Sequence, residues 1–231
     1  MAAEGTGDLP AVLLLHGFAT SAARTWGDNG WIDLVGDMGR TVLAPDLLGH
    51  GTSPKPHDPE AYADLGGPIL EVMPDEPVDA IGFSLGARVL LEIAVRHPER
   101  FRKLVLSGVG ANLFRTEGSD LVRRALQGDA DLTDPVARYF ATLASEADGD
   151  PVALDALLQA DHLPLTAENL AAMACPTLVV LGEHDFAGPA DPLVDALPDA
   201  QLVMLPRTDH FATPKDFRFI DAALDFINGD T

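Results

Sequence analysis

The sequence contains very little cysteine and no long apolar run. Cys175 is the only cysteine in 231 residues, so no disulfide can form within the chain. Because Cys175 precedes Pro176 and an apolar run, we expect a buried structural thiol. No stretch approaches the ~20 apolar residues that a membrane-spanning helix requires. Residues 1–10 lack the basic and apolar segments of a signal peptide, so we predict a cytoplasmic protein.

Positive charge is scarce as well. The chain has 15 Lys and Arg against 36 Asp and Glu, which gives a formal net charge of −21 at pH 7. Nucleic acids and anionic membrane surfaces would repel such a chain, so neither is an expected partner. The hydrophobic content of 47% is sufficient for a sizeable core, and the length fits one large α/β domain or two small ones. The oligomeric state stays open.

Short apolar runs alternate with helical patterns along most of the chain. Each run is bounded by turn residues, which is typical of buried parallel strands. The predicted strands are 11–15, 41–44, 78–83, 103–107, 177–181 and 201–205. The helical patterns between them are 31–38, 86–96, 193–196 and 217–226. This alternation predicts an α/β fold with a mainly parallel sheet and helices on both faces.

One interval breaks the alternation. Between Ser107 and Pro176 there is no strand pattern, and several short segments look helical. These segments are 121–126, 135–143, 151–158 and 167–173. We predict that residues 112–170 form a helical cap, or lid, inserted after the strand at 103–107, and that 1–111 and 171–231 form the core domain. The alternative is an enlarged crossover connection, whose helices would not roof a pocket.

The pattern Gly-x-Ser-x-Gly at residues 82–86 lies between a predicted strand and a predicted helix. A serine at such a turn takes a strained backbone conformation, and small flanking residues let the strand and the helix approach closely. The strain directs the hydroxyl of Ser84 out of the turn, at a helix N-terminus where partial positive charge gathers. This arrangement indicates an activated nucleophile, although a tight turn with a solvated serine also fits the pattern when it is taken alone.

A serine nucleophile needs a base, and the base needs an orienting acid. In open parallel sheets, functional groups lie on loops at the carboxyl ends of the strands. Asp185 follows the strand at 177–181, and His210 follows the strand at 201–205. The chain order Ser84, Asp185, His210 is the one that accompanies this kind of turn. We therefore predict a catalytic triad of these three residues.

Other residues compete for the roles of base and acid. His184 adjoins Asp185 on one loop, so it cannot easily turn toward a serine on another strand. His162 lies in the predicted insertion, and His97 precedes a proline at a helix end. Asp209 and Glu183 are alternative acids, but a sequence neighbour of His210 rarely presents the required geometry, and Glu183 has the opposite parity at its strand end.

The segment 16–18 follows the first predicted strand and suggests an oxyanion hole. Acyl transfer needs donors that point at the developing oxyanion. The backbone N–H groups of Phe18 and Leu85 are the candidate donors, and Gly17 would let the backbone come close. The residues predicted to line the substrate pocket are Gly17, Thr20, Trp26 and Phe211. Packing within the loop is the alternative for Thr20 and Trp26.

Together these segments resemble the α/β-hydrolase fold family over nearly the whole chain. The matching segments are 14–18, 44–53, 81–87, 176–185 and 209–211. The Asp-x-x-Gly-His-Gly-x-Ser pattern at 46–53 is a strong marker of the family, in which its role is architectural. The resemblance implies that a substrate binds between the sheet and the cap at 112–170.

The chain departs from the family pattern in two places. The sheet of the family usually begins with an antiparallel hairpin, but only residues 1–10 precede the first strand here. We therefore predict a truncated sheet of six parallel strands that lacks most or all of this hairpin. Haloalkane dehalogenases and epoxide hydrolases of this fold carry aspartate at the serine turn, so Ser84 disfavours those activities.

We expect a serine hydrolase, similar to carboxylesterases, that acts on a small carboxylic ester or thioester through an acyl-enzyme. The enzymatic alternatives are a carbon–carbon bond hydrolase of the meta-cleavage type, in which Arg88 could bind a carboxylate, and acyl transfer or perhydrolysis. A non-catalytic small-molecule receptor is the alternative from another class. We expect no metal and no cofactor, because no His or Cys pair has ligand spacing and no phosphate-binding fingerprint is present.

Overall fold

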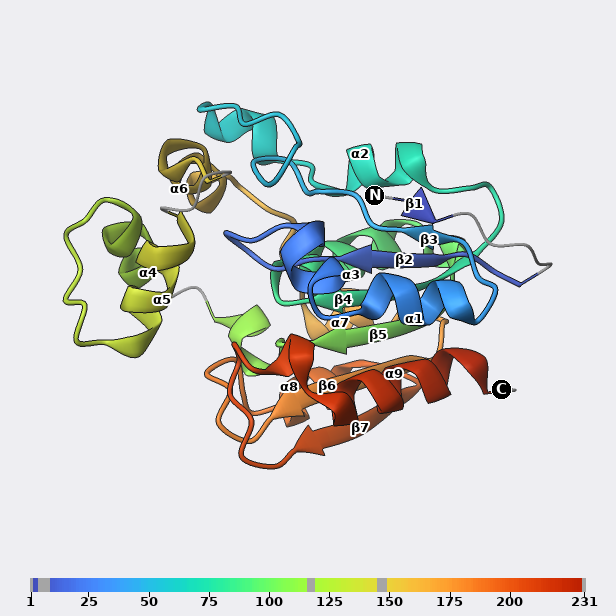
Figure 1. Ribbon diagram of the computed structural model, residues 1–231. Helices are drawn as coiled ribbons and strands as arrows, with labels where there is room; N and C mark the ends of the chain where they lie inside the picture. The colour runs from blue at the N-terminus through green and yellow to red at the C-terminus, as the bar shows by residue number, and fades with distance from the viewer. Residues whose placement is uncertain (1, 4–8, 116–118, 145–148, 230–231) are drawn as a thin grey trace.

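The computed structural model describes residues 2–3, 9–115, 119–144 and 149–229, and a seven-stranded sheet forms its centre (Figure 1). The strand order is β1-β3-β2-β4-β5-β6-β7. Strands β2 to β7 are parallel to their neighbours, and β1 pairs with β3 in the antiparallel direction. The strands are β1 Ala2–Ala3, β2 Val12–Leu15, β3 Val42–Leu43, β4 Val78–Phe83, β5 Phe101–Ser107, β6 Thr177–Gly182 and β7 Ala200–Leu205.

The six parallel strands predicted from the sequence are confirmed, and every predicted end lies within two residues of the observed one. In place of the antiparallel hairpin, the described residues show the two-residue strand β1. Strand β3 is also only two residues long. The sequence pattern predicts these strands well because each is a mainly apolar run between turn residues. Strands β4 and β6 are buried throughout, whereas the edge strand β7 is partly exposed.

Helices cover both faces of the sheet. Helices α1 (Trp31–Asp37) and α9 (Phe217–Asn228) pack on one face, and α2 (Gly66–Val72), α3 (Leu85–Arg96) and α8 (Asp191–Ala196) pack on the other. Side chains of β2 alternate between these two layers: Leu13 and Leu15 join the core with α3, while Val12 and Leu14 join the core with α1 and α9. This alternation is the period of two that a strand imposes. Both faces are therefore apolar, as a buried parallel sheet requires.

Three helices lie beyond the carboxyl edge of the sheet: α4 (Ser119–Leu126), α5 (Pro135–Ala144) and α6 (Pro151–Gln159) (Figure 1). They form a small apolar cluster of their own, which includes Ala19 and the half-buried Phe18 from the loop after β2. Helix α7 (Ala167–Leu170), which also falls within the predicted insertion, packs instead against α3 and α8. Helix α6 joins both cores, because Leu154 lies in the small cluster while Ala156 and Leu157 lie in the core with α3. Within the interval 112–170, α4 and α5 are therefore the helices that contribute to the small cluster alone.

Cys175 is only 6% exposed. Burial raises the pKa of its thiol to about 11, which leaves very little reactive thiolate at neutral pH. The expectation of a buried cysteine is confirmed. Among the described residues, no helix is long and apolar enough to cross a membrane.

The register of the sheet brings the loops after five strands to one edge. Leu15 at the end of β2 pairs with Gly82, and Phe83 at the end of β4 pairs with Ser107 at the end of β5. Gly182 and Leu205, at the ends of β6 and β7, pair with each other. The residues that follow these strands therefore lie along one edge of the sheet, which faces α4 to α6 (Figure 1).

Candidate active site

Ser84 occupies the turn between β4 and α3 in a strained backbone conformation, with φ 54° and ψ −112°. Its N–H donates to the carbonyl oxygen of Ser107 at 2.8 Å, which anchors the turn to β5. The flanking residue Gly86 must be glycine, because a Cβ there would lie 2.1 Å from the carbonyl oxygen of Leu15. A Cβ at Gly82 would lie 2.7 Å from the Cα of Ala87. The two glycines therefore allow the close contact of helix and strand that the turn requires.

The side chains of Ser84, His210 and Asp185 form one hydrogen-bonded chain. The His210 Nε2 lies 3.1 Å from the Ser84 Oγ, and the His210 Nδ1 lies 2.9 Å and 3.0 Å from the two Asp185 carboxylate oxygens. The Asp185 carboxylate can only accept, so His210 carries its proton on Nδ1 and presents a lone pair from Nε2 to the serine hydroxyl. Both side chains are nearly inaccessible to solvent: 4% of His210 and none of Asp185 is exposed. The three residues predicted as a triad are thus brought together.

The competing residues lie elsewhere. His184 is exposed on the loop after β6. The Asp209 carboxylate accepts from the N–H of Ala212 at 2.8 Å, and the Glu183 carboxylate accepts from the N–H of Arg207 at 2.8 Å. The carboxylate of each alternative acid is therefore hydrogen-bonded to a backbone N–H group instead of to His210. The His162 Nε2 lies 3.2 Å from the carbonyl oxygen of Leu157, in the last turn of α6.

The loop that carries His210 is held by the N-terminus of α9. Asp216 caps this helix by accepting from the N–H of Arg218 at 3.0 Å. The same carboxylate accepts from the Thr208 hydroxyl at 2.7 Å, two residues before His210. Hydrogen bonds from the Arg218 side chain, helped by the one from Thr208, lower the pKa of Asp216 to about 2 although burial opposes the shift. The cap therefore anchors the histidine loop through a charged group.

We expect the variant Asp216→Asn to lose stability in a pH-dependent way. Because the pKa of Asp216 is depressed to about 2 in the folded chain, its ionised form stabilises the fold above about pH 5, and this contribution fades as the pH falls toward 2. The free energy of unfolding should drop by about 1–2 kcal/mol at pH 7. This range is smaller than the full pKa shift implies, because solvent screens the interaction with the exposed Arg218 side chain. About half of that cost should remain at pH 3. Urea unfolding at both pH values measures it, with Asp221→Asn, an exposed change on α9, as the control. An equal cost at pH 7 and pH 3 would contradict this assignment.

The loop after β2 passes close to the serine. A Cβ at Gly17 would lie 2.9 Å from the Phe83 ring and 3.5 Å from the Ser84 Cβ, so glycine is required for this approach. The next residue, Phe18, is half-buried. Leu85 is the first residue of α3, so its N–H has no partner in the preceding turn of the helix. The loop of Gly17 and the first residue of α3 therefore both adjoin Ser84, and the roles of the Phe18 and Leu85 N–H groups in binding an oxyanion stay predictions.

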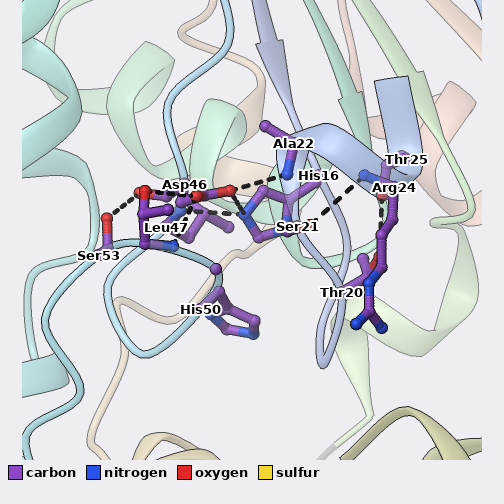
Figure 2. Close-up of polar contacts among 12 residues, drawn as sticks. His16, Thr20, Ser21, Ala22, Arg24, Thr25, Asp46, Leu47, His50 and Ser53 are labelled. Carbon is purple, nitrogen blue, oxygen red and sulfur yellow. Dashed lines mark hydrogen bonds and ion pairs between the residues drawn. The ribbon is translucent and has the colours of Figure 1, made fainter. Parts of the chain in front are cut away.

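A polar network, drawn in Figure 2, supports the loops after β2 and β3. One Asp46 carboxylate oxygen accepts from the Ala22 N–H at 2.8 Å, and the other accepts from the N–H and hydroxyl of Thr52 at 2.8 and 2.9 Å. These bonds outweigh the effect of burial and lower the pKa of Asp46. The His16 Nε2 accepts from the Leu47 N–H at 3.0 Å. The family marker at 46–53 therefore ties down the neighbouring loop that carries Gly17 and Phe18.

Within the same segment, His50 is only 2% exposed, and its ring contacts His16 and Phe18 edge to face. Burial, together with the nearby His16, lowers the pKa of His50 to about 3. The imidazole of His50 is therefore neutral at physiological pH and packs as a structural side chain beneath Phe18.

Aromatic side chains surround His210. The rings of Phe83 and Phe186 lie 4.9 and 4.3 Å from the His210 ring, measured between centroids. Phe211 stacks on Tyr139 of α5 at 3.6 Å. The prediction that Phe211 borders the site fits this placement, whereas the sequence analysis missed Phe186 and Tyr139. The signal that could have found Phe186 is its position directly after the predicted acid.

Two other residues singled out from the sequence make contacts that do not fit their predicted roles. Trp26 has no exposed surface and packs against Trp31 at 5.2 Å in the core beneath α1, so it is a core residue rather than a pocket residue. Arg88 is paired with Glu92 at 2.9 Å and donates to the Leu163 carbonyl oxygen at 3.0 Å, which ties α3 to the segment after α6. It is therefore not available to bind a substrate carboxylate in this structure.

Thr20 lies on the loop after β2, and its hydroxyl is 3.3 Å from the Thr25 hydroxyl (Figure 2). This contact supports loop packing for Thr20. Across the described residues, no group of three or more His, Cys, Asp or Glu side chains could hold a metal ion.

A parallel α/β sheet with a strained serine turn and a histidine–acid pair at its carboxyl edge defines a hydrolase-type protein. The chain matches the model of the alpha/beta hydrolase family over residues 12–222, and it belongs to this family.

Its curated relatives have different activities. The 2-hydroxymuconate semialdehyde hydrolase of Pseudomonas sp. (strain CF600) is 34% identical over 118 residues, which cover 48% of this chain and 41% of that protein. The pimeloyl-[acyl-carrier protein] methyl ester esterase of Neisseria meningitidis serogroup A is 30% identical over 233 residues, which cover 86% of this chain and 70% of the esterase. The match thus spans less than half the length of the first relative.

Solved structures resemble this fold at low sequence identity. The 2-hydroxy-6-oxo-6-phenylhexa-2,4-dienoate hydrolase from Rhodococcus sp. strain RHA1 has a TM-score of 0.74 at 23% identity and covers 96% of this chain and 92% of its own. The enol-lactonase from Burkholderia xenovorans LB400 has a TM-score of 0.73 at 22% identity, and the match covers 99% of this chain and 95% of the enol-lactonase. These similarities establish the fold and leave the substrate open.

Proposed function

We propose that this protein is a serine hydrolase that acts on a small carboxylic ester or thioester. The observation that carries the proposal is the hydrogen-bonded chain from Ser84 through His210 to the buried Asp185. A serine that is held at a strained turn and hydrogen-bonded to an imidazole has the two features that nucleophilic catalysis needs. Membership of a hydrolase family and the esterase relative support the same activity.

In the proposed reaction, the Ser84 Oγ attacks the carbonyl carbon of the substrate while His210 Nε2 takes the hydroxyl proton. The N–H groups of Phe18 and Leu85 stabilise the negative charge on the carbonyl oxygen. The carbon–leaving group bond then breaks, and His210 returns the proton to the departing alcohol or thiol. Water, deprotonated by His210, then attacks the acyl carbon, the bond from this carbon to the Ser84 Oγ breaks, and His210 returns the proton to the Oγ as the carboxylic acid leaves. Asp185 holds the imidazole in its orientation and stabilises its charged form throughout.

A second candidate is hydrolysis of a carbon–carbon bond in a dienoate, because the first of the curated relatives described above is a hydrolase of this kind. The same serine and histidine would serve this reaction. Its substrate carries a carboxylate, and the arginine that the sequence offered for it, Arg88, is already engaged by Glu92 and Leu163. The ester or thioester substrate is therefore the preferred proposal.

A substrate screen separates these candidates. We expect the protein to hydrolyse p-nitrophenyl esters of short acyl chains faster than a 2-hydroxy-6-oxo-dienoate, with Ser84→Ala as the blank in every assay. A faster Ser84-dependent loss of the dienoate would favour carbon–carbon cleavage. No turnover of any substrate by the folded protein would support the receptor function instead. The expected small-molecule partner and the cytoplasmic location both remain predictions.

A further inference from the structure

Phe186 is an exposed aromatic side chain between two buried residues of the candidate site. Its exposed fraction is 44%, whereas the neighbouring residues Asp185 and Ala187 are both buried. The Asp185 carboxylate accepts from the Ala187 N–H at 2.8 Å, so a closed turn fixes the backbone on both sides of Phe186. The exposure of this ring is therefore set by the turn that positions the acid.

The Phe186 ring packs over the imidazole of His210. The ring centroids are 4.3 Å apart and the planes are tilted by 33°. The Phe186 ring also lies 5.9 Å from the ring of Phe211, which stacks on Tyr139 from α5. An aromatic surface thus extends from the acid loop, past His210, to the helices beyond the sheet.

The chemistry of acyl transfer places the leaving group beside this surface. His210 Nε2 must deliver its proton to the departing atom, so that atom comes within hydrogen-bond distance of Nε2. The substituent on the leaving atom then lies next to Phe186, which packs on the imidazole. In the proposed reaction the carbonyl oxygen of the acyl group is bound by the loop of Gly17 and Phe18 and not beside the imidazole. Phe186 is therefore placed to contact the leaving group and not the acyl group.

We infer that Phe186 is a specificity-determining residue that favours esters with a flat, apolar leaving group such as an aryl alcohol. This inference rests on the proposed ester hydrolysis at Ser84. Aromatic rings attract one another in offset or tilted arrangements beyond what burial alone supplies, whereas an alkyl leaving group gains only the burial. The exposed part of the Phe186 ring is the surface that such a group would cover.

The test compares two ratios of kcat/KM in the variant Phe186→Ala. The first ratio, 2-naphthyl acetate to trifluoroethyl acetate, varies the leaving group, and we expect it to fall about fivefold or more. The second ratio, phenyl acetate to phenyl butyrate, varies the acyl group and should change less than about twofold, since this pair shares one aryl leaving group. The variant Phe186→Tyr should keep both ratios. Phe217→Ala removes an exposed phenylalanine at the start of α9 and serves as the matched control that shifts neither.

An unchanged leaving-group ratio in Phe186→Ala, or loss of the preference in Phe186→Tyr, would overturn the inference. An equal fall in both ratios would also overturn it, because Phe186 would then affect the site as a whole. The proposed function survives these results as long as the wild-type protein hydrolyses the esters and Ser84→Ala does not. If wild-type turnover is absent or independent of Ser84, the proposed function itself fails and the inference fails with it.

Discussion

Replacing Ser84 with alanine should reduce the kcat for p-nitrophenyl acetate by about 10³–10⁶-fold, and the additional change His210→Ala should cost little more. The two side chains are joined by the 3.1 Å contact between Oγ and Nε2 and act as one unit in the proposed reaction. Removal of either one abolishes the acyl-enzyme route, so the losses do not add. Steady-state kinetics of Ser84→Ala, His210→Ala and the double variant measure this directly.

The matched control for this series is His184→Ala. His184 lies on the loop after β6 next to Asp185, but its side chain is exposed. We expect this variant to keep its kcat within about threefold, since surface changes of this kind rarely disturb the fold. Losses that multiply in the double variant, with all the proteins folded by circular dichroism, would show that Ser84 and His210 act independently.

The change Asp185→Asn should reduce kcat by about 10³–10⁴-fold while the protein stays folded. Asparagine preserves the shape of the side chain and can still accept from the Ala187 N–H. It removes the negative charge that stabilises the imidazolium, and its amide group would replace a carboxylate oxygen 3.0 Å from His210 Nδ1. The imidazole then loses both its orientation and its electrostatic partner.

Asp209→Asn is the matched control, because it makes the same chemical change on the sequence neighbour of His210. The Asp209 carboxylate caps a turn by accepting from the Ala212 N–H, and an asparagine oxygen can do the same. We expect little loss of activity from this variant. A larger loss from Asp209→Asn than from Asp185→Asn would assign the acid to Asp209.

The sequence allowed the sheet and the three polar residues to be predicted because their signals are local. Each strand is an apolar run, and Ser84, Asp185 and His210 lie on the loops that follow three of them. The rule that parallel strands end at one edge then brings distant residues together without knowledge of any side-chain contact. The catalytic roles of these residues remain proposals until activity is measured.

Packing between loops could not be predicted in this way. Trp26 lies one short loop beyond Phe18, and only the observed turn of residues 23–27 shows that its ring enters the core. Arg88 follows the serine turn on α3, but its partner Leu163 lies 75 residues further along the chain. Phe186 directly follows the predicted acid, but its contact with His210 depends on how β6 and β7 are paired.

Helix α2 was missed for a different reason. Its sequence starts with Gly66, Gly67 and Pro68, which are residues typical of turns and loops. The structure shows that a Cβ at Gly66 would lie 2.8 Å from the Ile93 side chain. The glycine therefore allows α2 to pack closely on α3, and tertiary contact outweighs the low helix propensity.

The most direct test of the central proposal is covalent labelling with a fluorophosphonate, followed by mass spectrometry of the peptides. Such a probe phosphonylates a serine only where a neighbouring base activates it. The account predicts a single adduct on Ser84 in the wild-type protein and no adduct in folded His210→Ala. An adduct on another serine, or no adduct in the folded wild-type protein, would contradict it.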